Sequence, residues 1–149
     1  MTTITHTPPP AAPSWQTLEI MGNRLRLHAG AAETGGRLAL VEYHAAPGFP
    51  GPARHIHPEF DEVFVVLEGS LTLVQRDDTL IAVSVDAAVA PGIVPHTLAD
   101  AAPIPCRFLV AMTPGGFEDY FAALAELVAG GAPPAAFEEL SARFGVVNA

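Results

Sequence analysis

The sequence contains no lysine, a single cysteine and no long hydrophobic run, and each absence excludes a class of function. All seven basic residues are arginine, which excludes a lysine Schiff base and a lysine-anchored pyridoxal phosphate. Cys106 stands alone, which excludes an internal disulfide and a cysteine-rich metal site and favours a cytoplasmic location. Hydrophobic residues make up 50% of the chain, yet every apolar run ends before the roughly 18–20 residues of a membrane helix. The sequence therefore predicts a buried core and no membrane-spanning segment.

The charge balance limits the partners that the protein can bind. Sixteen acidic residues against seven basic ones give a formal net charge of −9. This charge repels phosphate backbones and anionic lipid surfaces, so we expect neither nucleic acid nor a membrane as a partner. The first seven residues have no basic residue and no apolar stretch, so we expect no secretory signal there.

Turn residues and short apolar runs divide the chain into three regions. Residues 1–13 end in a proline-rich stretch and are expected to be a flexible tail. Residues 14–113 are expected to form a β-barrel, because short strand-like segments follow one another with no helical pattern between them. The segments are Leu18–Ile20, Leu25–His28, Leu38–Tyr43, Val63–Leu67, Leu71–Val74, Leu80–Val83, Ala87–Ala90 and Arg107–Met112.

The third region, residues 114–149, changes to helical periodicity. Apolar residues recur at helical spacing from Phe117 to Val128, and two glycines then end the pattern. Two prolines precede a second amphipathic stretch that ends at Gly145. We expect two short C-terminal helices that pack against the barrel, with a ligand-lining or subunit-contact role as the alternative.

The segment that begins at His55 carries the clearest sign of chemistry. His55 and His57 are two residues apart, a spacing that places both side chains on one face of a strand. Glu62 shares one face of the following apolar run with Phe64, so its carboxylate needs a partner if it is buried. Neutral imidazoles and a carboxylate suit a divalent transition metal. Asp61 is the alternative carboxylate, but strand parity and spacing favour Glu62.

A strand supplies only part of such a site, so a more distant ligand is expected. His96 is the best candidate, because it lies in an apolar stretch about 40 residues later, where the returning half of a barrel can bring it alongside. The other histidines, which we expect to be structural or exposed to solvent, are His6, His28 and His44.

These residues resemble the first motif of the cupin family. The motif has two histidines one residue apart, then a glutamate after three or four residues and a glycine after six more. The matching residues are His55, His57, Glu62 and Gly69. The glycine that the motif places six residues before the first histidine is here Phe49.

The second cupin motif is matched in part. Its proline and its histidine correspond to Pro91 and His96. The positions of its two glycines and its asparagine are occupied by Val85, Ile93 and Asp100. Gly92 lies one residue before the expected glycine and is a candidate for the same turn.

The resemblance implies an all-β jelly-roll barrel, the double-stranded β-helix, with a metal inside and a homodimer as the common assembly. It implies one divalent transition metal per chain, which can be Fe, Ni, Mn, Co, Cu or Zn, held by His55, His57, Glu62 and His96. A single barrel with an aromatic-rich helical tail also looks like the small quercetin-dioxygenase-like cupins.

Three functions remain open for a site of this kind. The first is a dioxygenase that acts on a small enolic or phenolic, flavonol-like substrate, with Glu62 as the base that takes its proton. The second is a non-redox isomerase, cyclase or decarboxylase of a small metabolite. The third is a binding protein without turnover. Arg54 is a candidate for orienting an anionic substrate, and the candidates for an aromatic-lined cavity are Phe49, Phe60, Phe64, Phe108 and Phe117.

Overall fold

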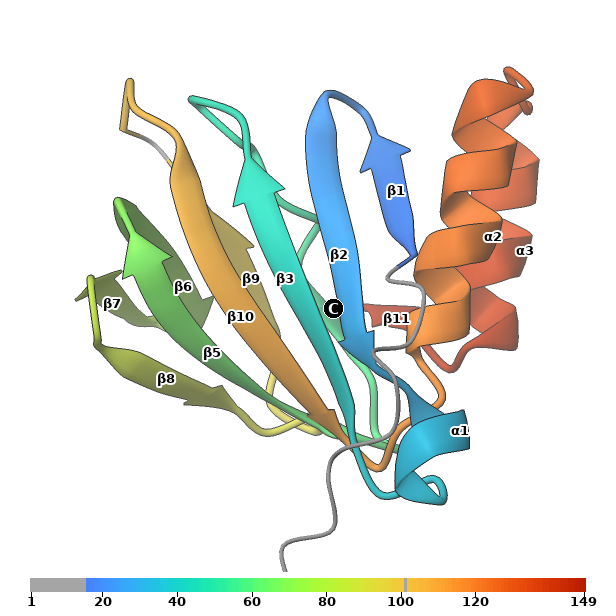
Figure 1. The fold of residues 1–149 in the computed structure, drawn as a ribbon, viewed down its shortest axis with the longest axis horizontal. Helices are drawn as coiled ribbons and strands as arrows, with labels where there is room; N and C mark the ends of the chain where they lie inside the picture. The colour runs from blue at the N-terminus through green and yellow to red at the C-terminus, as the bar shows by residue number, and fades with distance from the viewer. Residues whose placement is uncertain (1–15, 101) are drawn as a thin grey trace, which may run out of the picture.

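Two antiparallel β-sheets face each other, and helices lie along one side of the pair (Figure 1). The structure, a computed structural model, describes residues 16–100 and 102–149. The expected tail, residues 1–13, and His6 lie outside the described residues. None of the described helices has the length and hydrophobicity that a membrane crossing requires.

The strand order identifies the fold. One sheet has the order β1-β2-β3-β10-β5-β8 and the other has the order β11-β4-β9-β6-β7. The strands of the first are β1 (Thr17–Ile20), β2 (Asn23–Ala29), β3 (Ala39–Ala45), β10 (Cys106–Thr113), β5 (Asp61–Glu68) and β8 (Ala87–Ala90). Those of the second are β11 (Val147–Asn148), β4 (His55–Ile56), β9 (His96–Ala99), β6 (Ser70–Gln75) and β7 (Asp78–Val83). The chain passes repeatedly from one sheet to the other, as in a jelly roll, so the expected all-β fold with two C-terminal helices is confirmed.

Alternation along the strands separates the core from the outer surface. In β5 the side chains of Glu62, Phe64 and Val66 are buried between the sheets, and those between them are less buried. The inner face of β10 alternates in the same way and buries Cys106, as expected for a small hydrophobic residue. Burial raises the pKa of the Cys106 thiol to about 11, so the thiol stays protonated at neutral pH.

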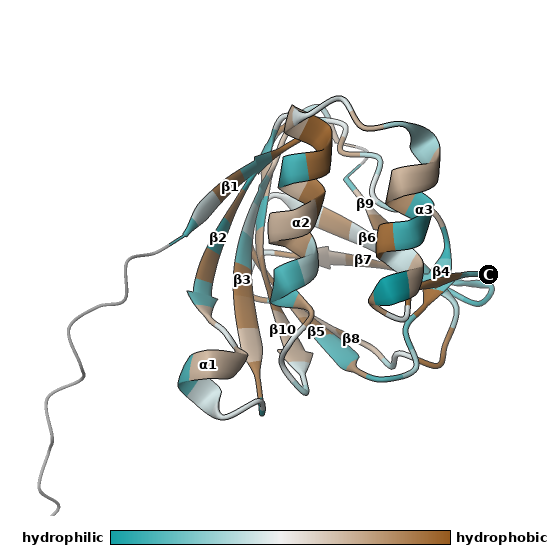
Figure 2. Ribbon diagram, turned by 90° about the vertical axis from the view of Figure 1, so that its right-hand side faces the viewer, coloured by the Kyte–Doolittle hydropathy of each residue, from teal (hydrophilic) through white to brown (hydrophobic). Residues whose placement is uncertain are grey.

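Two helices cover the side of the molecule where the sheets are furthest apart (Figure 2). They are α2 (Glu118–Ala129) and α3 (Pro134–Arg143), and they follow the short helix α1 (Ala31–Thr34), which the sequence did not predict. Phe121 of α2 and Leu140 of α3 are buried. The helices therefore close the barrel with their apolar sides.

Some turns differ from the sequence-based expectation. Aspartate favours turns and the sequence has two here, Asp77 and Asp78, but Asp78 pairs with Gln75, so the loop consists of Arg76 and Asp77. Arg76 has a φ of 52°, a left-handed conformation that arginine seldom adopts, and the sequence gives no sign of it. Strands β9 and β11 were also not expected, and the strand expected to carry His55 and His57 ends at Ile56.

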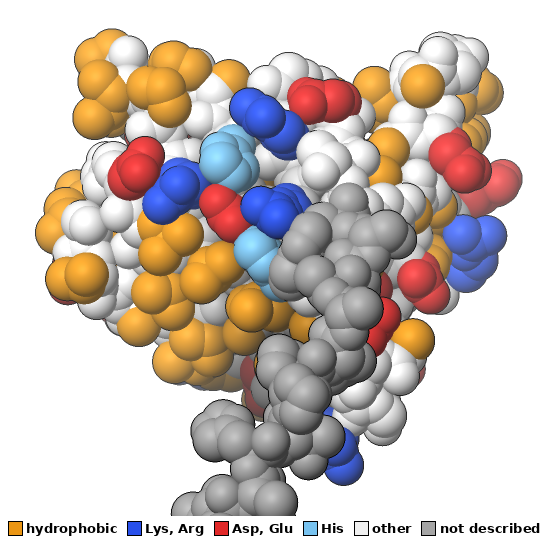
Figure 3. All heavy atoms as spheres, viewed as in Figure 1, with side chains coloured by type: hydrophobic (Ala, Val, Ile, Leu, Met, Phe, Trp, Pro, Cys, Tyr) orange, Lys and Arg blue, Asp and Glu red, His pale blue; other side chains and the backbone are white. Residues whose placement is uncertain are grey.

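The outer face of the first sheet has a polar half and an apolar half (Figure 3). The polar half lies over β2, β3 and one end of β10, where Glu42 contacts His28, His44 and Arg107. The apolar half lies over β5 and β8, where Val63 and Val65 are partly buried and Val89 is 56% exposed. The second half is therefore an uncovered hydrophobic surface on the described chain.

Candidate metal centre

His55 and His96 come together because their strands are neighbours. His55 lies on β4 directly opposite His96 on β9, and directly opposed residues have Cβ atoms about 4.5–5.5 Å apart. Both side chains are buried and their ring centroids lie 4.6 Å apart. The pairing that brings them together spans about 40 residues of sequence, as the sequence-based interpretation required.

His57 follows β4 and is positioned by a tight turn rather than by a strand. Its backbone oxygen accepts a hydrogen bond from the Phe60 amide at 3.2 Å, so the chain reverses at Pro58. The Phe60 ring stacks on the imidazole with centroids 3.9 Å apart and planes 7° apart. The His57 amide also donates to the Gly92 carbonyl at 2.9 Å. The turn, the aromatic ring and Gly92 thus fix the imidazole.

The two neighbouring carboxylates, Asp61 and Glu62, have different positions. Glu62 lies on the inner face of β5 and is 7% exposed. Asp61 is exposed, and its Oδ1 accepts a hydrogen bond from the Gly92 amide at 2.8 Å. Asp61 therefore holds the turn that contains Gly92, a role that the sequence did not predict, and Glu62 faces the histidines.

Hydrogen bonds to the backbone define the tautomer of all three imidazoles. The Nδ1 atom lies 2.7 Å from the carbonyl oxygen of Ala53 for His55, 2.8 Å from that of Phe60 for His57 and 2.8 Å from that of Val94 for His96. A carbonyl oxygen only accepts, so each Nδ1 carries a hydrogen. In a neutral imidazole Nε2 then carries a lone pair, which is the form that binds a metal.

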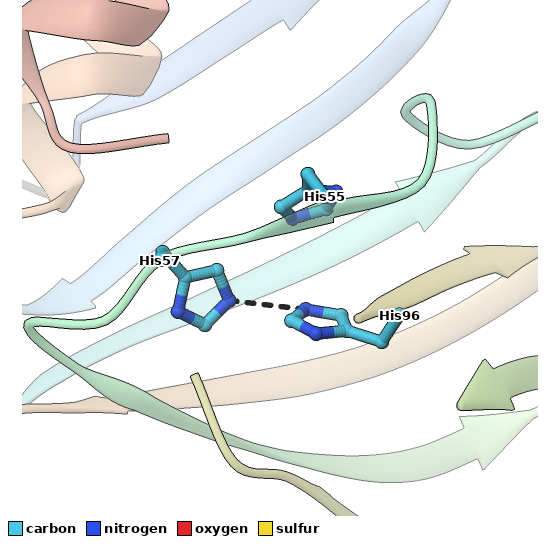
Figure 4. Close-up of side chains that lie close together, drawn as sticks. All are labelled: His55, His57 and His96. Atoms are coloured by element: carbon cyan, nitrogen blue, oxygen red, sulfur yellow. Dashed lines mark hydrogen bonds between the residues drawn. The ribbon is translucent and has the colours of Figure 1, made fainter. Parts of the chain in front are cut away.

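The Nε2 atoms converge with one carboxylate oxygen. Those of His57 and His96 lie 3.0 Å apart (Figure 4), and the Oε2 atom of Glu62 lies 3.1 Å from the first and 3.4 Å from the second. One nitrogen from each of His55, His57 and His96 lies within 4.8 Å of the others. The structure thus brings together the four residues singled out in the sequence.

This arrangement requires a positive charge among the four groups. Lone pairs and a carboxylate at these distances repel one another unless a cation lies between them. A second proton on one imidazole supplies that charge, and so does a divalent transition metal, for which imidazole nitrogen and carboxylate oxygen are suitable ligands. The donor set therefore fits a metal ion.

The groups also shift one another's protonation. Burial by itself raises the pKa of Glu62, but its close contacts with the Nε2 atoms of His57 and His96 outweigh it and lower the pKa below its ordinary value. Burial lowers the pKa of His57, but the hydrogen bond and negative charge of Glu62 outweigh that effect and raise it. The pKa of His55 is lowered by burial. At neutral pH Glu62 is therefore ionised.

A cavity of about 430 Å³ opens onto this site between the two sheets and the C-terminal helices. His55 and Glu62 line it, and most of its remaining wall is hydrophobic. Its aromatic lining residues are Tyr43, Phe49, Phe64, Phe108, Phe117, Tyr120, Phe121 and Phe137. Phe60 does not line the cavity, since it packs against His57. Arg54 is not among the lining residues either, so the structure gives no support for its orienting an anionic substrate.

Tyr43 is one of the cavity residues that sequence reasoning missed. It shares one face of β3 with Ala39, Val41 and Ala45, all three of which are buried. The same alternation in the sequence points Tyr43 toward the interior. The signal was thus present, but it was interpreted only as a strand pattern.

The family and fold of the chain follow from comparison with known proteins. Residues 41–112 match the family described as Cupin domain. An RmlC-like cupin from Shewanella frigidimarina superposes with a TM-score of 0.60 at 17% identity, covering 74% of this chain and 93% of that one. KdgF from Halomonas sp. gives 0.59 at 20% identity, covering 71% and 90%. The polyketide cyclase RemF from Streptomyces resistomycificus gives 0.57 at 23% identity, covering 72% and 80%. At these identities the structures show a shared fold, and no curated protein matches the sequence.

Proposed function

The chain belongs to the cupin superfamily, and from that premise we propose that it is a metal-dependent dioxygenase of a small enolic or phenolic compound. His55, His57, His96 and Glu62 would hold one divalent transition metal. The observation that carries the proposal is the convergence of their Nε2 and Oε2 atoms at the end of an apolar, aromatic-lined cavity. When bound, the metal would supply Lewis-acid and redox chemistry to a substrate oxygen and to O₂.

The protein's own residues would prepare the substrate for this chemistry. Glu62 is ionised and lies at the cavity wall, so its carboxylate would accept the proton of the substrate hydroxyl and leave an enolate. The carbonyl partners of the three Nδ1–H groups would keep the imidazoles in the metal-binding tautomer. The hydrophobic wall would exclude water from the reacting enolate.

A non-redox cyclisation or isomerisation is the second candidate. It is favoured by the same pairing of an ionised carboxylate with an aromatic-lined cavity, because proton transfer from carbon or oxygen requires no O₂. RemF, which shares the fold, is named a polyketide cyclase.

The two candidates differ in oxygen consumption. Untagged protein would be analysed for bound metals, stripped, and reloaded separately with Fe, Ni, Mn, Co, Cu and Zn. Each form would be mixed with 3-hydroxyflavone in an oxygen electrode and in an anaerobic cuvette. We expect oxygen uptake with at least one metal and none with metal-free protein. Substrate conversion without O₂ would support the second candidate, and no conversion with any metal would contradict both.

A further inference from the structure

The cavity contains an unusual combination of groups for a ligand site. Its charged or titratable lining side chains are Glu62, His55 and two tyrosines, and no arginine lines it within the described chain. Away from the metal centre, a phosphate or free carboxylate in this space would lose water without gaining a cationic side chain. The lining therefore favours an uncharged ligand with extended apolar surface.

Tyr43 is held rigidly in this wall. Its ring stacks on Phe108 with centroids 5.1 Å apart and planes 4° apart. Phe49 at 5.9 Å and Phe121 at 6.0 Å contact it from other directions. Three aromatic neighbours leave the ring little freedom, so the hydroxyl has a fixed position in the cavity.

The Tyr43 hydroxyl has no hydrogen-bond partner among the described residues. The other tyrosine differs, because the Tyr120 hydroxyl lies 3.5 Å from Ser141 Oγ. Burial and the negative charge of Glu62 raise the pKa of Tyr43, so its phenol remains protonated and acts as a hydrogen-bond donor at neutral pH. An unpaired donor in a hydrophobic cavity is favourable only when a ligand supplies an acceptor.

We propose that Tyr43 orients the substrate by donating a hydrogen bond to the carbonyl oxygen of an uncharged, planar aromatic ligand in this cavity. The inference rests on the proposed function in one respect: the ligand lies with its hydroxyl toward Glu62, the proposed base. Glu62 and Tyr43 then contact two different oxygens of the same molecule. The apolar walls contact its ring faces, and this fixes which oxygen reaches the base.

The test uses 3-hydroxyflavone as a fluorescent probe with metal-free, full-length protein, so that binding is measured apart from turnover. Its emission has a normal band and a proton-transfer band, and a donor to its carbonyl oxygen weakens the internal hydrogen bond and strengthens the normal band. We expect Tyr43→Phe to bind the probe about 3- to 10-fold more weakly, the effect of one neutral hydrogen bond. We also expect the normal band to lose intensity relative to the other band.

Tyr120→Phe is the comparison variant, and we expect it to weaken binding less because its hydroxyl already has a protein partner. A 3-hydroxyflavone that carries a sulfonate on its phenyl ring should bind at least 10-fold more weakly than the parent compound. Melting curves would establish that both variants are folded.

Unchanged affinity and unchanged emission in Tyr43→Phe would overturn the proposal, as would an equal or larger loss in Tyr120→Phe. Equal binding of the sulfonated probe, or no binding of 3-hydroxyflavone by the wild type, would overturn the ligand class. Tyr43-dependent binding without oxygen uptake by any metal-loaded form would leave this inference standing and refute the dioxygenase.

Discussion

Replacing Gly92 with alanine tests whether the backbone beside His57 positions its imidazole. A Cβ atom at residue 92 would lie 2.0 Å from the Phe60 carbonyl oxygen, 2.3 Å from the His57 carbonyl oxygen and 2.8 Å from His57 Nδ1. Two of these atoms belong to backbone, which cannot rotate away as a side chain can. The strain must therefore move the turn that carries His57.

The size of the effect follows from these distances. Ordinary contacts of a Cβ atom begin at 3.4 Å, so the His57–Phe60 turn or the residue 92 backbone has to move by about 1 Å or more. Overpacking of this kind costs about 1–3 kcal/mol of unfolding free energy, which lowers the Tm by roughly 2–12 °C in a chain of this size. Because the Nδ1 partner of His57 moves with the turn, metal affinity should fall about 10- to 100-fold.

Thermal melting of metal-free protein would measure the first effect, and competition with a chelating dye would measure the second. Gly130→Ala is the matched control: its added Cβ comes no closer than 3.3 Å, to Glu126 O, and its φ of −82° suits alanine. We expect its stability to change by about 1 kcal/mol or less and its metal affinity to stay unchanged. Wild-type Tm and metal affinity in Gly92→Ala would refute the reasoning.

Three further predictions concern the base, the outer surface and the assembly. When both proteins are loaded with metal, Glu62→Gln should turn over substrate about 10²- to 10⁴-fold more slowly than the wild type and still bind it. A loss of activity only in proportion to the loss of bound metal would show that Glu62 is a metal ligand and not the base. Burial raises the pKa of Glu42, but its hydrogen bonds with His28 and His44 outweigh that and lower it. A lowered carboxyl pKa stabilises the fold above about pH 4.5 and loses this effect as the pH falls through the folded-state value. Acid unfolding followed by circular dichroism should therefore show that Glu42→Gln loses less stability below pH 4.5 than the wild type does. Equal losses of stability would contradict this prediction. Because β5 and β8 leave an apolar outer face, we expect a homodimer, and light scattering should give twice the 15.5 kDa mass of the chain. Val89→Glu should shift the equilibrium toward the monomer. A wild-type monomer at micromolar concentration would oppose the prediction.

Periodic patterns allowed much of the fold to be predicted. The alternation in β5 placed Glu62, Phe64 and Val66 on one buried face, and β8 has the expected bounds, Ala87–Ala90. The two C-terminal helices follow from their apolar spacing and their flanking glycines and prolines. In these elements the local spacing of apolar residues and the flanking glycines and prolines determine the secondary structure, so the sequence predicts it.

Features set by distant pairing were not predictable in the same way. Strand β4 has only two residues and lies between β9 and β11, so no periodic pattern marks where it ends. The position of His57 depends on a turn, a stacked ring and Gly92, none of which the spacing of the two histidines reveals. His96 was found because its distance along the chain matched a motif, whereas the role of Asp61 depends on a contact with residue 92, 31 positions away.

The separation between the elements that carry the polar groups and those that complete the cavity has an evolutionary consequence. His55, Glu62 and His96 lie on strands of the two sheets, while Phe121 and Leu124 line the cavity from within α2. Substitutions in the helical segment can therefore alter the shape of the ligand space without displacing a single imidazole. Natural divergence and laboratory engineering can both change selectivity there while the reactive centre is inherited intact.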